Sequence, residues 1–204
     1  MSVKQISLNI PTDWKDITIE KYQKYLKLVN SKRGNKKIEE GAIKLFCNIS
    51  DSLLKKMKLK DRKQIASKIA TFINGDPQKE LERVVVFNGK EFGFIPNLNK
   101  ITTGEYIDIE EYSKNLNDNL HSIMSVLYRE VDKKSGEMYS IKPYDPDELT
   151  DVDFKQFPMS TTLSAVHFFF HLGRNLLRDF NSYLNREKMM EKKKLSQANG
   201  VGTV

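Results

Sequence analysis

The sequence predicts a mainly α (α+β) fold, in which a helical domain carries a small antiparallel β-hairpin and one long C-terminal helix. Apolar residues recur every three or four positions through most of the chain, as in amphipathic helices. Asn88-Gly89 separates two runs of β-branched and aromatic residues. Residues 159–190 keep the helical spacing longest. We therefore expect one compact α-rich domain over residues 1–190, a flexible basic tail over 191–204, and no internal repeat.

The first part of the chain is expected to form a short strand followed by four helices. Apolar and polar residues alternate over residues 4–10, as in a half-buried strand. Thr18 and Asp61 are suitable N-cap residues, because their side-chain oxygens accept a backbone N–H at a helix start. Gly75 follows the last of these helices and ends it. The helices are expected over residues 18–30, 37–48, 50–58 and 61–73.

A β-hairpin is predicted between residues 84 and 95. Val, Phe and Ile are the main residues of its two runs, 84–87 and 91–95. A two-residue type I′ turn needs positive φ at both positions, and Asn88-Gly89 meets that need. Pro96 follows the second run and, having no backbone N–H, ends the strand.

The stretch FGFIPNLNKITTGEYID, residues 92–108, contains glycines, acidic residues and a pair of threonines, as a phosphate-binding loop can. Glu105, however, stands three residues after Thr102, which is the pattern of a capping box at the start of a helix over 103–115. A phosphate loop needs the pattern GxxxxGK[ST], which this stretch lacks. We therefore interpret the stretch as the exit of the hairpin followed by the start of a helix.

The next part of the chain ends in an acidic segment. A helix is expected over residues 117–128, followed by a loop or a weak hairpin around Ser135-Gly136. Residues 145–153 then hold five carboxylates, without the alternation and the terminal Glu of a calcium loop. We interpret this segment as a solvated loop or as a docking site for a basic partner.

The long helix expected over residues 159–190 has two apolar stripes. The first repeats like a heptad seam and is expected to build the core. The second is predicted to contact a partner or a second copy, and burial of both stripes in one core is the alternative. The first stripe consists of Met159, Leu163, Val166, Phe170, Leu177 and Phe180. The second consists of Phe169, Leu172, Leu176 and Tyr183.

Residues that carry catalytic or metal chemistry do not form a recognisable set. His167 and His171 have the four-residue spacing of zinc-protease histidines, but Phe168 stands where those enzymes have Glu. We interpret the two histidines as a structural pair, and Cys47, in an apolar run, as a buried thiol. The sequence contains no nucleophile elbow and no Cys–His signature. We expect no enzymatic activity, no metal and no cofactor.

The net charge of +7 is unevenly distributed. Residues 1–100 hold 21 Lys/Arg against 11 Asp/Glu, residues 101–172 hold 6 against 13, and residues 173–204 hold 7 against 3. Such a chain is suited to bind a nucleic acid, itself or a charged protein. A basic run lacks interleaved aromatic residues, so a solvated face is the alternative to a nucleic-acid-facing surface. The run consists of Lys55, Lys56, Lys58, Lys60, Arg62, Lys63 and Lys68.

Membrane insertion is not expected. The N-terminus lacks the apolar core of a signal peptide. No uncharged apolar run approaches the ~18–20 residues that span a bilayer. The sequence therefore predicts a soluble protein of a reducing compartment.

Three segments carry a family resemblance: IPTDWKDITIEKYQKYL, FGFIPNLNKITTGEYIDIEEY and FPMSTTLSAVHFFFHLGRNLL, with HSIMSVLYREV and YSIKPY between the last two. Their order resembles small proteins encoded among the structural genes of tailed bacteriophages, usually called tail assembly chaperones or virion proteins. The resemblance implies a non-enzymatic role in virion assembly, by binding another phage protein in the cytoplasm of the infected bacterium. The alternatives are a structural virion subunit at the neck or tail, and a DNA-binding accessory protein that uses the basic run.

Overall fold

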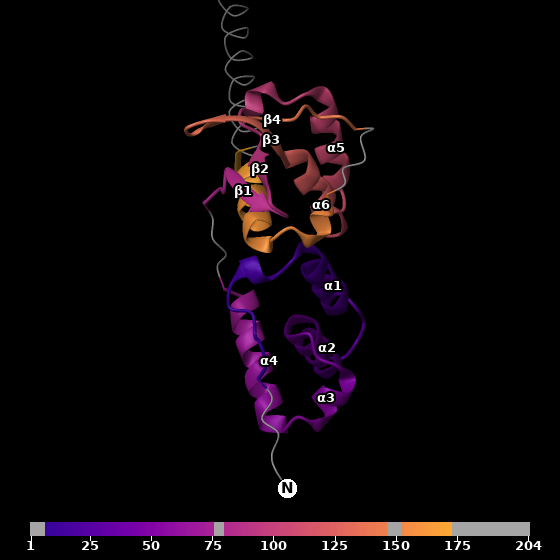
Figure 1. The fold of residues 1–204 in the computed structure, drawn as a ribbon. Coiled ribbons are helices and arrows are strands. Elements are labelled where there is room, and N and C mark those ends of the chain that lie inside the picture. The colour runs from indigo at the N-terminus through magenta and orange to yellow at the C-terminus, as the bar shows by residue number, and fades with distance from the viewer. Residues whose placement is uncertain (1–6, 76–79, 147–151, 173–204) are drawn as a thin grey trace, which may run out of the picture. The chain divides into compact units, whose positions relative to one another are not determined.

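Figure 1 shows the chain as a computed structural model, which describes residues 7–75, 80–146 and 152–172. The chain divides into two units, one ending at Ala165 and the other beginning at Val166, and each is described by itself. In the first unit, the described residues form helices first and then an antiparallel sheet accompanied by further helices. The mainly α fold with an antiparallel β component is thus confirmed.

The N-terminal part of the first unit is helical. Its helices are α1 (Ile19–Val29), α2 (Asn35–Cys47), α3 (Asp51–Lys56) and α4 (Leu59–Ile73). α2 packs against both α1 and α4. Ile43 and Phe46 of α2 and Ile65 and Ile69 of α4 are buried, as the apolar faces of amphipathic helices should be. Cys47 is buried as predicted, and burial raises the pKa of its thiol.

The predicted helices of this part are present, with their ends displaced by one or two residues. The Thr18 hydroxyl caps α1 by accepting a backbone N–H of the first turn at 3.2 Å. The expected cap of α4 is wrong, because that helix begins after Lys58 and Asp61 lies in its first turn. The expected strand at 4–10 is also wrong over residues 7–10, which have no strand partner for their backbone groups; residues 4–6 lie outside the described ranges.

The sheet has four antiparallel strands in the order β1-β2-β3-β4. They are β1 (Val84–Phe87), β2 (Lys90–Phe94), β3 (Tyr128–Ser135) and β4 (Met138–Ile141). The predicted hairpin is confirmed, with φ of 50° at Asn88 and 76° at Gly89. A second hairpin, β3–β4, turns at Gly136, whose φ is 61°. β2 also pairs with β3, which places Phe94 opposite Tyr128 and joins the two hairpins into one sheet.

Two helices accompany the sheet, α5 (Thr103–Ser113) and α6 (Leu116–Leu127), and they pack against each other (Figure 1). A 3-10 turn, η2 (Leu98–Lys100), leads from β2 towards α5. The predicted capping box is confirmed: Glu105 N–H donates to Thr102 Oγ1 at 3.2 Å, and Thr102 N–H donates to Glu105 Oε2 at 2.6 Å. The glycine-containing stretch is therefore a hairpin exit followed by a helix start, as predicted.

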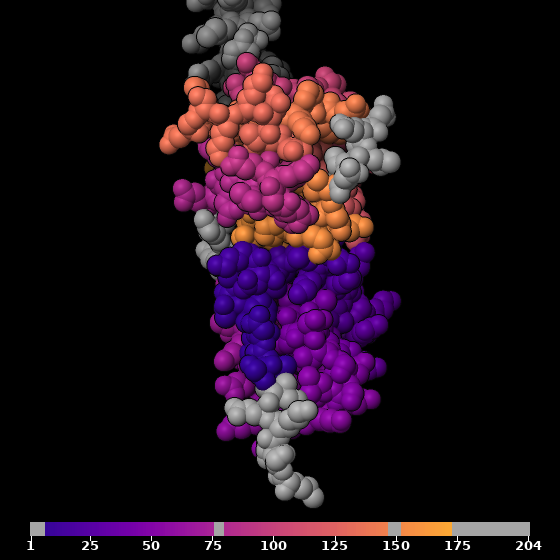
Figure 2. All heavy atoms as spheres, viewed as in Figure 1, coloured from indigo at the N-terminus to yellow at the C-terminus, as the bar shows by residue number. Residues whose placement is uncertain are grey.

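Two segments far apart in the sequence pair with each other and join the helical part of the unit to the sheet-containing part. The Ile19 N–H donates to the Phe157 carbonyl at 3.0 Å, and the Met159 N–H donates to the Ile17 carbonyl at 2.8 Å. The pairing is antiparallel and reciprocal. All four residues are buried, with exposed fractions of at most 1%. In Figure 2 the indigo N-terminal residues meet the orange residues of the later segment.

The two paired segments, residues 13–19 and 153–159, share one local structure, and we call them together the clasp. Their sequences, DWKDITI and DFKQFPM, both place an aspartate, an aromatic residue and a lysine first, and apolar residues at the fifth and seventh positions. Each aspartate accepts the N–H of the lysine two residues later, at 2.9 and 3.0 Å. Each segment contains a 3-10 turn, η1 (Trp14–Asp16) or η3 (Phe154–Gln156). The two segments are therefore two copies of one short local motif.

Residues 159–172 form a helix that continues from the clasp. Small and polar residues make up most of its buried side up to the end of the first unit, and Leu163 of the predicted core stripe is only half-buried. The buried residues are Met159, Thr161, Thr162, Ser164 and Ala165. The rest of the predicted helix, 173–190, and the predicted tail, 191–204, lie outside the described residues. Every helix in the described ranges is too short or too polar to cross a membrane.

Candidate functional site

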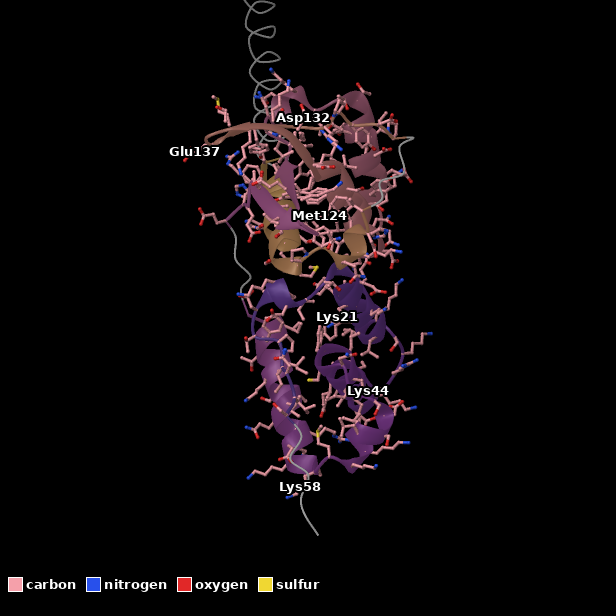
Figure 3. All side chains as sticks on the ribbon, viewed as in Figure 1. Lys21, Lys44, Lys58, Met124, Asp132 and Glu137 are labelled. Atoms are coloured by element: carbon pink, nitrogen blue, oxygen red, sulfur yellow. The ribbon has the colours of Figure 1, made fainter. Side chains whose placement is uncertain are left out.

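The predicted basic run forms an exposed surface on α3 and α4. Six of its seven residues are exposed, and Figure 3 shows Lys58 at the turn between these helices, directed away from them. Arg62 differs, because it donates to Glu40 at 2.8 Å and its side chain is only 18% exposed. Lys55 lies on α3 one turn after Asp51 and contributes to the electrostatic surroundings of that carboxylate, and the other five lysines of the run remain. These five are called the lysine face: Lys56, Lys58, Lys60, Lys63 and Lys68.

The amphipathic pattern of α4 positions the lysine face. Ile65 and Ile69 are 8% and 3% exposed and pack into the helical part. Lys60 and Lys63 lie on the other side of the helix, given its period of about 3.6 residues. Leu59 is 59% exposed and precedes Lys63 by one turn on the same side. The surface therefore combines positive charge with an exposed apolar side chain.

α5 presents a second exposed surface, with carboxylates in place of lysines. Tyr106 and Ile107 are 56% and 55% exposed, and Glu110 and Glu111 follow them one turn later on the same side. Glu105 and Ile109, both 3% exposed, mark the packed side of this helix. We call the four exposed residues the α5 face: Tyr106, Ile107, Glu110 and Glu111.

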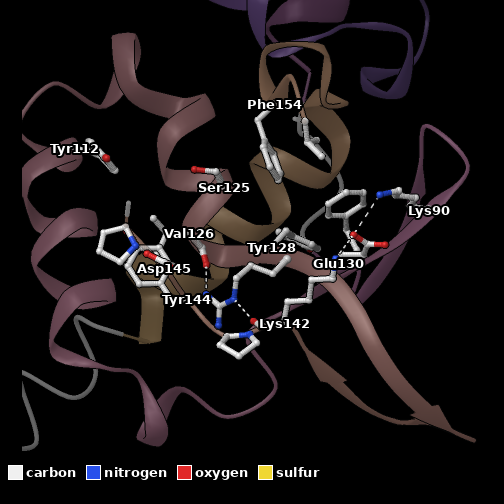
Figure 4. Close-up of a pocket in the computed structure, with 15 residues that line it drawn as sticks. Lys90, Tyr112, Ser125, Val126, Tyr128, Glu130, Lys142, Tyr144, Asp145 and Phe154 are labelled. Atoms are coloured by element: carbon white, nitrogen blue, oxygen red, sulfur yellow. Dashed lines mark hydrogen bonds and ion pairs between the residues drawn. The ribbon is translucent and has the colours of Figure 1, made fainter. Parts of the chain in front are cut away.

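An ion pair with little access to solvent holds α5 in place. Glu105 Oε1 lies 2.6 Å from Arg129 Nη1, and the two side chains are 3% and 15% exposed. The guanidinium also donates to the carbonyls of Val126, at 3.0 Å, and Lys142, at 2.7 Å (Figure 4). Arg is always charged in proteins, so the Glu105 carboxylate supplies the compensating charge. The capping glutamate thus connects the start of α5 to β3.

Tyr144 extends this network to the segment after β4. Its ring centre lies 5.6 Å from the Arg129 guanidinium carbon, which is a cation–π distance. Its hydroxyl donates to the Asp108 carboxylate. Burial, and next the hydrogen bond to Asp108, raise the pKa of Tyr144 above its usual value. The phenol is protonated at neutral pH, as any tyrosine with the usual pKa is, and it donates to α5.

A pocket of about 420 Å³ lies beside this network, and its lining includes Tyr112 and Phe154 (Figure 4). Lys90 and Lys142 also line it, and both approach Glu130 Oε2, at 3.3 and 2.8 Å. The single Glu130 carboxylate compensates one of these two positive charges. The pocket lies where α5, α6, the sheet and the segment after β4 meet.

The residues predicted to bind a partner are described only in part. Phe169 and Leu172 are half-buried residues of the helix that begins at Met159. Leu176 and Tyr183 lie outside the described residues. Whether the four form one surface stays a prediction.

The two histidines of the long helix lie together, as their spacing predicts. The rings of His167 and His171 are stacked with centres 6.0 Å apart. In the described ranges, no three His, Cys, Asp or Glu side chains gather in a way that suits a metal ion. In the acidic segment, residues 147–151 lie outside these ranges, and Asp153 accepts the Lys155 N–H at the start of η3. Asp153 thus has a capping role in the clasp.

Comparisons of this chain with protein-family models, with curated proteins and with solved structures found no match. The candidate site is therefore defined by its own geometry: two exposed helical faces of opposite charge, each on a firmly packed helix.

The α5 face and Arg129 were not predicted from the sequence. Tyr106, Ile107 and Ile109 together cover more than one side of a helix, which is a signal that some of them are exposed. Arg129 gives no such signal. Its partner Glu105 is distant in sequence and already explained by the capping box.

Proposed function

We propose that this chain is a non-enzymatic bacteriophage morphogenesis protein, similar in role to a tail assembly chaperone, which binds another phage protein during virion assembly. The observation that carries the proposal is the order of the three segments that resemble small proteins of tailed bacteriophages. Two of these segments meet in the clasp, and the third forms β2 and α5. The segments at residues 10–26 and 92–112 thus belong to the first unit, and the one at 157–177 begins in the clasp and runs past Ala165. The protein would act in the cytoplasm of the infected host.

In this proposal the phage partner binds the second apolar stripe of the long helix. Phe169 and Leu172 belong to its described part, and Leu176 and Tyr183 continue it in the sequence. Aromatic and aliphatic side chains of this kind form the centres of protein interfaces. A chaperone would use such a stripe to cover an aggregation-prone apolar segment of its partner until assembly.

Deletion of the gene from its phage tests this proposal. Heads should form while complete tails and infectious particles are lost, because the protein is needed before the particle is finished. Immunodetection separates the two forms of the role: a chaperone is absent from purified virions, whereas a structural subunit at the neck or tail is present in them. A normal yield of infectious, tailed particles without the gene contradicts both forms.

The binding stripe has its own test in co-expression with the tail proteins of the same phage. Leu172→Asp should abolish co-purification of the partner, because a charge in an apolar interface is buried without a counter-ion. His167→Asp, at an exposed position of the same helix, is the matched control and should retain the partner. Retention of the partner by both variants contradicts the stripe.

A DNA-binding accessory role is the second candidate, and the lysine face favours it. Contacts to DNA phosphates make log K fall with log salt by about 0.9 per phosphate. A shift of duplex DNA with a salt slope that becomes smaller in Lys60→Gln/Lys63→Gln would support this role. Absence of binding at low salt would exclude it.

A further inference from the structure

The first unit contains two parts of opposite net charge. Residues 7–75, which include α1 to α4, hold 16 Lys/Arg against 7 Asp/Glu. Residues 80–165, which include the sheet, α5 and α6, hold 9 against 16. Each copy of the chain therefore carries a surface that attracts the other part of a second copy.

The lysine face and the α5 face also match in detail. Leu59 precedes Lys63 by four residues on α4, Tyr106 precedes Glu110, and Ile107 precedes Glu111 in the same way on α5. Residues four apart are neighbours on one side of a helix. Each face therefore places exposed apolar side chains one turn from charges, with the charges of opposite sign.

We propose that the α5 face of one copy binds the lysine face of the next copy. The exposed apolar residues Tyr106, Ile107 and Leu59 would meet at the centre of this contact, and Glu110 would approach the lysines around it. Glu111, which also pairs with Lys114, would lie beside Glu110. The contact is heterologous, because the two surfaces differ. Repetition of such a contact produces a ring or an open filament.

A two-fold contact of one face with itself is disfavoured by the same charges. Two α5 faces would bring Glu110 and Glu111 against the same residues of the partner, and two lysine faces would do likewise. Like charges opposite each other cost free energy, whereas the head-to-tail arrangement pairs opposite charges. The α5 face is also held ready for binding, since Glu105 and Arg129 fix its helix.

Light scattering on the purified full chain tests the proposal. At low ionic strength the average mass should rise with protein concentration. At about 1 M salt, where the screening length is roughly 3 Å, it should fall to the mass of a single chain.

Two variants and their mixture separate a head-to-tail contact from non-specific association. Tyr106→Ser/Glu110→Gln removes the α5 face, and Lys60→Gln/Lys63→Gln removes the lysine face. Each variant alone should remain a single chain at all concentrations. An equimolar mixture should form a one-to-one pair that grows no further, because one intact face of each kind is left. All substituted residues are exposed, and circular dichroism checks that both variants are folded.

Matched controls carry the same changes of charge and apolar surface elsewhere. Glu137→Gln/Met138→Ser alters the β3–β4 hairpin (Figure 3), where Met138 is 76% exposed. Lys32→Gln/Lys36→Gln alters exposed lysines at the start of α2 and before it. Both controls should assemble like the parent.

Several results would overturn the proposal. They are a parent chain that stays single at low salt, equal loss of assembly in the controls, and a mixture of the two face variants that does not pair. Assembly that occurs only with added duplex DNA would also overturn it, and would indicate that the lysine face binds DNA phosphates. The measurement uses the purified chain alone, so its failure leaves the phage role untouched, and failure of the phage role leaves this contact untouched.

Discussion

Replacement of Glu105 by Gln is the sharpest test of how α5 is held. The substitution keeps the size of the side chain and an oxygen that accepts the Thr102 N–H, but it removes the charge opposite Arg129. The Arg129 guanidinium, whose side chain is 15% exposed, then keeps its positive charge without a counter-ion. We expect a marked loss of folding stability with little change in the secondary structure.

The magnitude follows from the burial of the pair. Removing one partner of a buried ion pair costs about 3–5 kcal/mol. Arg129 keeps its hydrogen bonds to the carbonyls of Val126 and Lys142, so the lower end, about 3 kcal/mol, is expected. At about 2–4 °C per kcal/mol for a chain of this size, the melting temperature should fall by roughly 6–12 °C.

Thermal and urea unfolding followed by circular dichroism measure this loss. The matched control is Lys114→Gln, because Lys114 lies outside the α5 face and pairs with Glu111 while both side chains are more than 60% exposed. An exposed pair contributes only about 0–1 kcal/mol, so the control should melt close to the parent. The double variant Glu105→Gln/Arg129→Met should recover part of the loss, since no unpaired charge remains buried.

Equal melting temperatures for Glu105→Gln and the parent would refute this reasoning. So would a double variant whose loss equals the sum of the two single losses, because two residues without coupling energy do not form a stabilising pair.

Three further predictions concern the hairpin, the clasp and α6. Gly89→Val should cost about 1–3 kcal/mol in urea unfolding, because a β-branched residue is strained at the φ of 76° found there; an unchanged midpoint contradicts the turn. Phe157→Ala should cost about 3–5 kcal/mol, since this fully buried ring fills the clasp; a loss below about 1 kcal/mol contradicts its packing role. Burial lowers the pKa of His121 below its usual 6.5, because the folded protein favours the neutral imidazole. The stability that the neutral His121 contributes is present above about pH 7. It is lost as the pH falls through 6.5 towards the pKa of the folded state. His121→Gln should therefore lose less stability than the parent between about pH 7 and 5.5, and parallel losses would show that another group titrates.

The sequence by itself determined the features that depend on residues close together in the chain. Thr102 and Glu105 are three residues apart, so their capping box needs no distant partner. Asn88 and Gly89 form the turn of β1–β2 because both tolerate positive φ. The buried stripe of α6 likewise follows from the spacing of its apolar residues.

The repeated motif of the clasp was present in the sequence but was not recognised. Only a few of its positions are alike, and the two copies lie at opposite ends of the first unit's sequence. Its importance appears when Ile19 is seen to pair with Phe157. Neither segment reveals its partner, since a short extended run offers its backbone groups equally to any other strand.

Tertiary structure decided which side chains are covered and which remain exposed. Tyr106 and Ile109 are both apolar residues of α5, yet only Ile109 is packed against a neighbouring element. Arg62 belongs to the basic run in the sequence, but in the structure it forms an ion pair with Glu40 of α2 and is not part of the lysine face. The type of a residue sets how much free energy its burial or ion pairing can contribute. Whether that contribution is made depends on which distant segments the fold brings next to the residue.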